Sequence, residues 1–161
     1  MSGKGKGESQ AKSPTIENRR ARFEYHLGET LEVGIVLRGS EVKSVRDGKV
    51  SLAEGFVVAK AEPAHLELVN VEIGEYSAAA ALGHRPKRTR TLLAHKGEIR
   101  KLAKAMEAKG ATIVPLKLYF KNGFAKLLIA TAKGKAAHDK RETIAKRESD
   151  RDIRRALSRR R

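Results

Sequence analysis

The sequence predicts a mainly β domain, built as a closed antiparallel barrel with peripheral helices, and a basic C-terminal tail that is disordered when the protein is free. Short β-branched segments alternate apolar with polar residues, and an Asn-Gly pair joins the last two of them. The tail, residues 133–161, holds twelve Lys or Arg but only three large apolar residues. Burial therefore cannot offset the entropy lost in ordering it.

The length of 161 residues suits one domain with extensions. Residues 1–16 are rich in Gly, Lys and Ser and predict a disordered N-terminal extension, so the barrel is expected over residues 17–132. The net charge is +16, and both ends are more basic than the middle: residues 1–22 carry six basic and two acidic side chains, and residues 133–161 carry twelve and five. This distribution indicates a polyanionic partner.

The composition excludes several classes of protein and site. The chain has no cysteine, which rules out disulfides, thiolate zinc sites and cysteine nucleophiles. No apolar run approaches the roughly 18 residues of a membrane span, and the N-terminus lacks the apolar centre of a secretory signal. We therefore expect a cytoplasmic protein that does not contact a membrane.

The first element expected is a strand over residues 31–37. Leu31, Val33, Ile35 and Leu37 form an inward row, whereas Glu32 lies on the opposite face. A short helix should follow, with Ser40 as a possible N-cap and Gly48 at its end.

A strand pair is expected next, over residues 55–61 and 65–73, joined by a turn that contains Pro63. The apolar phase of the second strand changes between Leu68 and Val69, which indicates a bulge or a bend. Residues 74–90 lack a period and predict a loop with a basic cluster.

Residues 95–110 predict a helix that Gly110 would terminate. Ile99, Leu102, Ala103 and Met106 share one face of it, as core-packing residues do.

The clearest local signal is the hairpin centred on Asn122 and Gly123, which specify a two-residue type I′ turn. That turn fixes the register, so Tyr119 should face Lys126, and Leu116 should face Ile129. One face is then apolar: Leu116, Leu118, Phe120, Ala125, Leu127 and Ile129. The other face is basic with interleaved aromatic rings: Lys117, Tyr119, Lys121, Phe124 and Lys126.

Three strands, a helix and a two-stranded hairpin occur in this order in five- or six-stranded Greek-key barrels of the OB type. Barrels of this type often bind oligonucleotides on an outer strand face. Since a fold does not by itself give a function, the function must be argued from the sites.

A catalytic site is weakly supported. The five histidines show no HExxH motif and no triad context, and the carboxylates are scattered among Lys and Arg. We therefore expect no catalytic residue, no metal and no cofactor.

The basic clusters are better candidates for function. Residues 18–22 and 85–90 concentrate arginine, whose planar fork suits phosphates and base edges. The second cluster contributes Arg85, Lys87, Arg88 and Arg90 as candidate RNA contacts, and the hairpin adds Lys117, Tyr119 and Lys126. With only seven Phe and Tyr in the chain, stacking on bases cannot dominate, so recognition of the backbone and shape of a folded RNA fits better.

The same segments resemble one known family. The stretches "NRRARFEY", "GIVLRGSEVKSVRDGKVSL", "KRTRTLLAHKGEI", "VPLKLYFKNGFAKL" and "AKGKAAHDKRETIAKR" are similar, in collinear order from about residue 16 to 150, to SsrA-binding proteins, also called small protein B. This resemblance implies an OB-like barrel that binds the tRNA-like domain of transfer-messenger RNA and delivers that RNA to stalled ribosomes, with a basic tail that enters the decoding region.

The resemblance also implies roles for individual residues. Glu32 matches an RNA-contacting glutamate of the first barrel strand, Leu93 a leucine after the basic loop, and Lys126 a lysine of the last hairpin. In the tail, which should become helical on ribosomal RNA, His138 would stack and Lys140 and Arg141 would bind phosphates. The remaining tail residues assigned to the ribosome are Lys133, Lys135, Asp139, Ile153, Ala156 and Leu157. The implied assembly is a monomer in a one-to-one complex with RNA.

Two other functions are compatible with the composition. An intrinsic ribosomal protein or assembly factor with basic arms would remain on washed ribosomes, whereas a rescue factor would copurify with a small stable RNA. An enzyme that acts on RNA would hydrolyse short RNAs.

Overall fold

The structure is a computed structural model that describes residues 13–159, apart from the side chains of residues 80–82. Most of the N-terminal extension expected over residues 1–16 lies outside the described residues. In chain order the elements are β1 (Ile16–Glu17), α1 (Arg19–Glu24), β2 (Tyr25–Ile35), α2 (Gly39–Arg46), β3 (Val50–Ser51), β4 (Phe56–Lys60), β5 (His65–Val69), β6 (Glu72–Ile73), the 3₁₀ helix η1 (Ser77–Leu82), β7 (Arg90–Leu93), α3 (Lys96–Ala105), β8 (Ala111–Lys121), β9 (Phe124–Gly134) and α4 (Ala137–Ser158).

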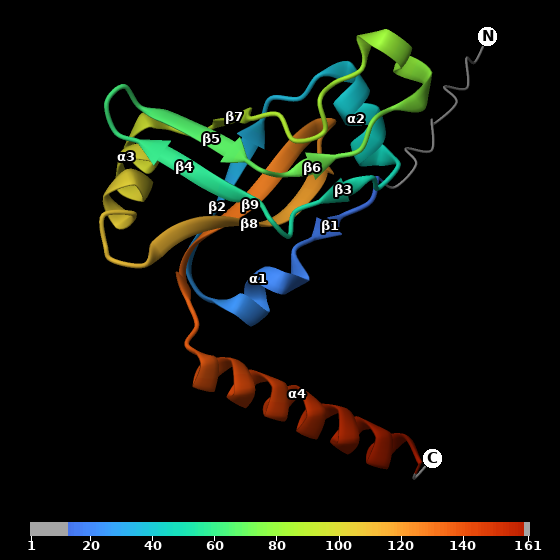
Figure 1. Ribbon diagram of the computed structural model, residues 1–161, viewed down its shortest axis with the longest axis vertical. Helices are drawn as coiled ribbons and strands as arrows, with labels where there is room; N and C mark the ends of the chain where they lie inside the picture. The colour runs from blue at the N-terminus through green and yellow to red at the C-terminus, as the bar shows by residue number, and fades with distance from the viewer. Residues whose placement is uncertain (1–12, 160–161) are drawn as a thin grey trace, which may run out of the picture.

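Seven of the strands form one antiparallel sheet in the order β1-β8-β9-β2-β7-β5-β4, and β3 pairs with β6 in a separate two-stranded sheet. The large sheet curls so that β4 lies beside β8, while α2, α3 and α1 surround the strands (Figure 1). The mainly β class with peripheral helices is confirmed. The closed barrel is not, because no strand pairing joins β4 to β8 and the hydrogen-bonded ladder stays open there.

The main core lies inside this curved sheet. Leu31, Val33 and Ile35 of β2 point into it, as their alternation predicts, and Leu37 packs against it just after the strand. Ile99 and Leu102 of α3 cover one end, 5% and 8% exposed. The predicted helix is confirmed but ends at Ala105, and Gly110, at φ +76°, belongs to the turn before β8.

Helix α2 begins two residues earlier than a cap at Ser40 would place it, and Arg38 occupies the N-cap position. The carboxylate of Glu41 accepts a 2.7 Å hydrogen bond from the backbone N–H of Arg38 instead. The Ser40 hydroxyl bonds to Nδ1 of His84 at 2.9 Å, so it ties α2 to the following loop. Gly48 follows the helix with φ +73°, a conformation that favours glycine.

The predicted strand pair is confirmed as β4 and β5, joined through a turn that contains Pro63. The change of apolar phase after Leu68 marks the end of β5 rather than a bulge within it. Asn70, with φ 59°, turns the chain, and Val71 is fully buried before β6 pairs with β3. The expected loop over residues 74–90 also contains η1 and the first residue of β7.

The hairpin of β8 and β9 has the predicted type I′ turn, with φ 52° at Asn122 and 78° at Gly123. Tyr119 faces Lys126, and the register holds from Lys121–Phe124 down to Lys117–Leu128. Below that point it shifts, because Ile129 pairs with Pro115 and leaves Leu116 in a bulge. Proline has no N–H to donate to a ladder, which favours a bulge at this place. The prediction that Leu116 faces Ile129 is therefore wrong, and Leu116 joins the opposite face.

A second, smaller core lies under α1 on that opposite face. It consists of Ala21, Val114, Leu116, Ala130 and Ala132. Asn18 anchors α1 there: its amide donates to the carbonyls of Leu52 and Pro115 at 3.1 and 2.9 Å, and its side-chain oxygen caps the helix by accepting from the N–H of Ala21.

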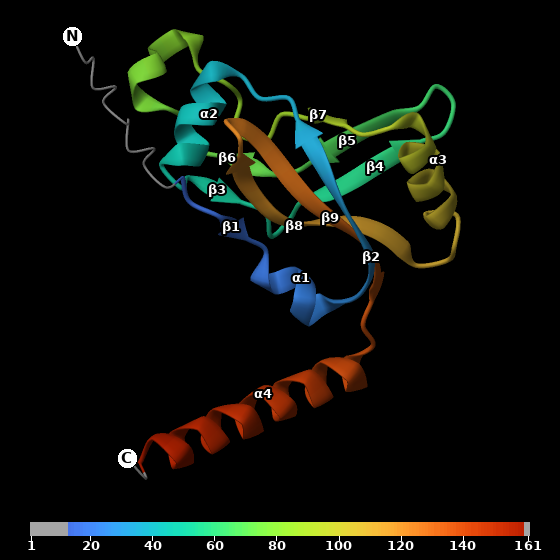
Figure 2. The same ribbon diagram turned by 180° about the vertical axis from the view of Figure 1, so that it is seen from behind.

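Helix α4 extends from the lower edge of the domain below α1, as Figure 2 shows from behind. Among the described residues, no helix has the length and apolar character needed to cross a membrane.

Candidate nucleic-acid interface

The candidate interface is the outer face, which we define as the side of β7, β2, β9 and β8 that points away from the main core. Register places its residues in two rows. Leu93, Gly34, Lys126 and Tyr119 are successive cross-strand partners in one row, and Glu32, Leu128 and Lys117 follow in the next. Three residues that the sequence predicted separately as RNA contacts, Glu32, Leu93 and Lys126, are thus brought together on adjacent strands.

Glu32 is the centre of the polar contacts on the outer face. Its carboxylate accepts a hydrogen bond from the hydroxyl of Tyr119 and lies 3.4 Å from Nζ of Lys121. The hydrogen bond from Tyr119, together with the nearby lysine charges, holds the pKa of Glu32 below its usual value. Partial burial and the same carboxylate raise the pKa of Tyr119 to about 12. At neutral pH the site therefore presents an ionised, oriented carboxylate between ammonium groups.

Replacement of Tyr119 by Phe should raise the pKa of Glu32 toward its ordinary value of 4.5, because the strongest hydrogen bond to the ionised form is lost. A carboxyl-detected NMR titration would measure this pKa. Tyr76→Phe is the control, since Tyr76 lies against Lys43 and not against Glu32. An unchanged Glu32 pKa in Tyr119→Phe would mean that the lysines alone set it.

Leu93 provides an apolar contact beside this carboxylate. Its side chain is 58% exposed although it lies within a strand. It faces Gly34, where an added Cβ would lie only 3.2 Å from the Cβ of Leu93, so the glycine leaves room beside it. An exposed leucine on the strand next to Glu32 can pack on a nucleobase while Glu32 and Lys126 bind ribose, base edges or phosphate.

The four predicted RNA contacts of the basic loop before β7 lie in two different environments. Arg88 and Arg90 bind a carboxylate of the protein itself, which corrects their prediction as RNA contacts. Arg90 is fully buried: it lies 2.8 Å from the equally buried Glu41 and donates to the carbonyls of Val71, Arg88 and Pro86. The guanidinium of Arg88 also bonds to Glu41. Both arginines therefore fasten the loop to α2, because a buried carboxylate requires cationic partners.

Arg85 and Lys87 of this loop remain exposed to solvent. Their contact with RNA stays a prediction.

Lys117 lies on the outer face but is already paired. Its ammonium is 3.0 Å from the carboxylate of Glu17 on the neighbouring strand β1. The hydrogen bond from Lys117 holds the pKa of Glu17 below its usual value, so that the pair is ionic at neutral pH.

The beginning of the tail is bound to the domain. The backbone N–H of Lys135 donates to the carbonyl of Glu24 at 2.9 Å, and its ammonium donates to the carbonyl of Arg22 at 3.2 Å, at the C-terminal end of α1. Asp139 accepts from Nε2 of His26 on β2 at 3.2 Å and lies 2.9 Å from Nε2 of His138. The hydrogen bond from His26 and the adjacent backbone and charges lower the pKa of Asp139.

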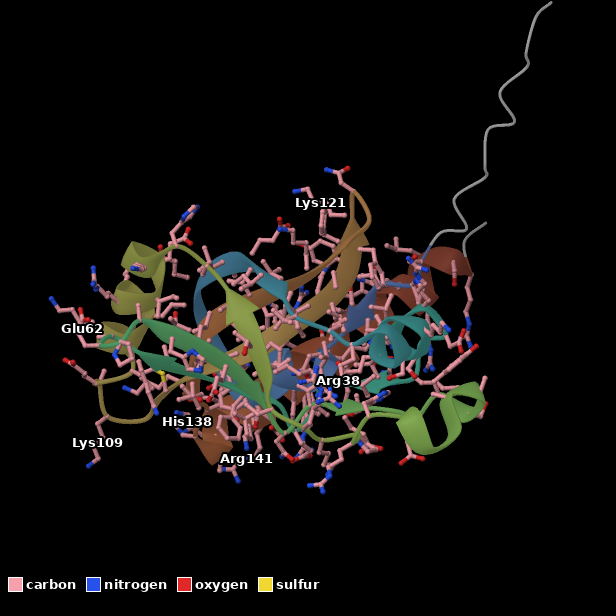
Figure 3. The ribbon with its side chains drawn as sticks, turned by 90° about the horizontal axis from the view of Figure 1, so that it is seen from above. Arg38, Glu62, Lys109, Lys121, His138 and Arg141 are labelled. Carbon is pink, nitrogen blue, oxygen red and sulfur yellow. The ribbon has the colours of Figure 1, made fainter. Side chains whose placement is uncertain are left out.

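The structure therefore differs from the expectation of a disordered tail: residues 137–158 form one helix in the isolated chain. The resemblance implies that the tail becomes helical on ribosomal RNA, whereas in the structure contacts with α1 and β2 already stabilise its beginning. Lys133 lies near the end of β9, opposite His26, and Lys140 and Arg141 lie in the first two turns of α4. His138 and Arg141 lie on the side of the domain away from Lys121 at the hairpin tip (Figure 3).

The distal part of α4 leaves its apolar residues in solvent. Ile153 and Leu157 are 55% and 63% exposed, on the same stripe as Ala156. No described residue of the domain covers this stripe.

Sequence reasoning missed several residues of this region. Asn18 was seen only as part of a basic cluster, although an Asn directly before a helix is an N-cap signal. The buried state of Arg90 could have been read from its phase with Leu92, because residues two apart on a strand share a face. No local sequence pattern indicates that His26 contacts Asp139 or that Arg147 contacts Phe23. Among the described residues, no group of three or more potential metal ligands occurs.

Comparison with known proteins supports the resemblance seen in the sequence. A family model described as "SmpB protein" matches residues 15–159. An SsrA-binding protein of Pelotomaculum thermopropionicum is 51% identical over 144 residues, which cover 89% of this chain and 93% of that protein. The SsrA-binding protein of Anaeromyxobacter dehalogenans is 45% identical over 161 residues, or 99% and 98% of the two chains.

One solved structure, described as "tmRNA-SmpB: a journey to the center of the bacterial ribosome", is also similar. It has a TM-score of 0.65 and 45% sequence identity, and the match covers 77% of this chain and 86% of that one.

Proposed function

Because the chain belongs to the SmpB family of SsrA-binding proteins, we propose that it binds transfer-messenger RNA through its outer face and acts with that RNA on stalled ribosomes in trans-translation. The domain that carries this face is an open, OB-like sheet. The tRNA-like part of the RNA is the expected ligand.

The observation that carries the proposal is the grouping of Glu32, Leu93 and Lys126 on three adjacent strands. A carboxylate, an exposed leucine and an ammonium offer three different contacts to RNA: hydrogen bonds to base or ribose groups, packing on a base, and phosphate neutralisation. Arg85 and Lys87 extend the positive field beyond β7.

The tail serves the ribosome in this proposal. His138, Lys140 and Arg141 contact RNA of the decoding region, and the exposed stripe of Ile153, Ala156 and Leu157 packs on a ribosomal surface. The protein acts as a monomer bound one-to-one to its RNA, without catalysis and without a cofactor, in the bacterial cytoplasm where ribosomes are found.

The experiment that tests the outer face is Lys126→Ala. If Lys126 neutralises one phosphate, the variant should bind the tRNA-like domain more weakly, and the slope of log K against log salt should fall by about 0.7 to 0.9. Binding titrations at several salt concentrations would measure both. Lys109→Ala is the matched control, because Lys109 is exposed in the turn between α3 and β8 (Figure 3).

Glu32→Ala should differ from Lys126→Ala in the salt dependence of binding in the same titrations. It should lose affinity with little change in slope, since it offers hydrogen bonds and no positive charge. Unchanged affinity and slope in Lys126→Ala, or a gain of affinity in Glu32→Ala, would remove that residue from the proposed site.

A further inference from the structure

A cleft lies beside the outer face, between β1, α1, β8 and α4, with a volume of about 220 Å³. Its charged lining is Arg19 and Arg22 of α1, Lys117 of β8, Arg147 of α4 and a single carboxylate, Glu17 of β1. We propose that this cleft binds a phosphodiester of the RNA backbone, as a continuation of the Glu32 site. The inference rests on the proposed function and extends it to a second set of residues.

The charge of the cleft is the first reason. Glu17 is ionised, because the hydrogen bond from Lys117 lowers its pKa, and it neutralises one cation of the four. Within the part of the chain that the structure describes, Arg19, Arg22 and Arg147 form no ion pair. Three guanidinium groups around one cleft, without carboxylate partners, favour an anion with several acceptor oxygens, and the planar fork of arginine suits phosphate.

The position of the cleft is the second reason. Glu32, Leu128, Lys117 and Glu17 are successive partners across β2, β9, β8 and β1, so the row that begins at the RNA-contacting carboxylate ends in the cleft. Strands are spaced by about 4.8 Å, which puts Lys117 about 10 Å from Glu32. A nucleic-acid strand that rises about 3.4 Å per nucleotide covers this distance in roughly three nucleotides. One RNA strand can therefore occupy both places.

The third reason is that the cleft joins the domain to the tail helix. Arg147 is the lining residue that comes from α4, and its guanidinium lies 5.6 Å from the centre of the Phe23 ring on α1. The ring holds the guanidinium at the rim of the cleft by a cation–π contact. A phosphate there would contact the domain and the tail helix together, so occupation of the cleft would fix where the tail starts.

The test uses the full chain and two RNA ligands, because the phosphate could belong to either partner. One ligand is the isolated tRNA-like domain of transfer-messenger RNA, and the other is the small ribosomal subunit. Arg19→Gln and Arg22→Gln each remove one charge from an exposed side chain and leave the core intact. Each should weaken binding roughly three- to tenfold and reduce the salt slope by about 0.7 to 0.9.

Glu17→Gln should do the reverse: it frees Lys117 and should tighten binding to the same RNA and increase the slope. Arg147→Lys keeps the charge but loses the planar fork and its stacking on Phe23, so it should retain only part of the binding, whereas Arg147→Gln should weaken binding as the α1 variants do. Phe23→Leu removes the ring but keeps all charges of the cleft, so it tests the docking of the tail on α1 separately from phosphate binding. Lys109→Gln, which lies outside the cleft, controls for net charge.

The two arms assign the source of the phosphate. If the cleft variants lose affinity for the tRNA-like domain, the result supports an RNA strand that continues from the Glu32 site. If they lose affinity only for the ribosomal subunit, the phosphate belongs to ribosomal RNA. If Arg19→Gln and Arg22→Gln match Lys109→Gln with both ligands, the cleft is no phosphate site. Lys126→Ala in the same series keeps that failure distinct from failure of the proposed function, since it tests the Glu32 site alone.

Discussion

A chain that ends after Lys133 is expected to bind the tRNA-like domain within about tenfold of the full protein, yet to lose tag addition on stalled ribosomes. Glu32, Leu93 and Lys126 all lie in the domain that remains. The truncation removes Arg147, hence the modest loss of RNA affinity, and it removes every residue proposed to enter the decoding region. The paired measurement is RNA affinity by titration and tag addition in a stalled translation reaction.

Smaller changes locate the effect within the tail. A chain that ends after Arg147 keeps the helix turns docked on α1 and should bind RNA like the full protein, but it lacks the stripe of Ile153 and Leu157 and should still fail in tagging. His138→Ala, and Lys140→Ala combined with Arg141→Ala, should each cause part of the loss. Normal tagging by either truncated chain would contradict this account of the tail.

The tail helix leads to a related expectation about the free protein. The tail contacts α1 and β2 through Lys135, just before the helix, and through Asp139 and Arg147 within it. The helix turns after Arg147 contact nothing in the described domain. An isolated, charged helical segment of this length is marginal in water. Amide exchange should therefore be slower near Asp139 than near Ile153, and ribosome binding should supply the missing stabilisation of the distal part.

The outer face could be predicted from sequence because its register is local. The Asn-Gly turn fixes the pairing of β8 with β9, and strict alternation along β2 places Glu32 opposite the core residues. These two signals require no knowledge of distant contacts. The predicted register failed at Pro115, where the missing N–H of proline favours a bulge and the distant Asn18 donates to the Pro115 carbonyl.

The basic clusters show the same limit. An arginine can bind a phosphate or a buried carboxylate. The strand phase of Arg90 with Leu92 indicates burial, but the local sequence does not identify the partner. Arg90 binds Glu41, 49 positions earlier, and Arg147 reaches α1 across most of the chain. Closure of the barrel was likewise beyond prediction, because it depends on whether the edge strand β4 exchanges hydrogen bonds with β8, not only on the order of strands.

Replacement of Glu41 by Gln should destabilise the domain by about 3 to 5 kcal/mol, the largest effect on stability that we expect. The carboxylate is fully buried and holds the backbone of Arg38 and the guanidinium groups of Arg88 and Arg90. A neutral amide leaves the charge of Arg90 buried without a counterion. Urea denaturation would measure the free energy of unfolding, with the exposed Glu72→Gln as the control.

The pH dependence of stability separates loss of charge from loss of shape. Burial alone would raise the pKa of Glu41, but hydrogen bonds from Arg88, Arg38 and Arg90 outweigh it, so the folded-state pKa is lowered from 4.5. The stabilisation is therefore present above pH 4.5 and is lost as the pH falls through the lower folded-state pKa. Glu41→Gln should lose this acid-dependent part of the unfolding free energy.

Glu41→Leu combined with Arg90→Leu should regain part of the stability at neutral pH, because no unpaired charge remains buried at Arg90. If Glu41→Gln unfolds at the same urea concentration as Glu72→Gln, the ion pair does not hold the basic loop on α2, and Arg88 returns to the set of candidate RNA contacts.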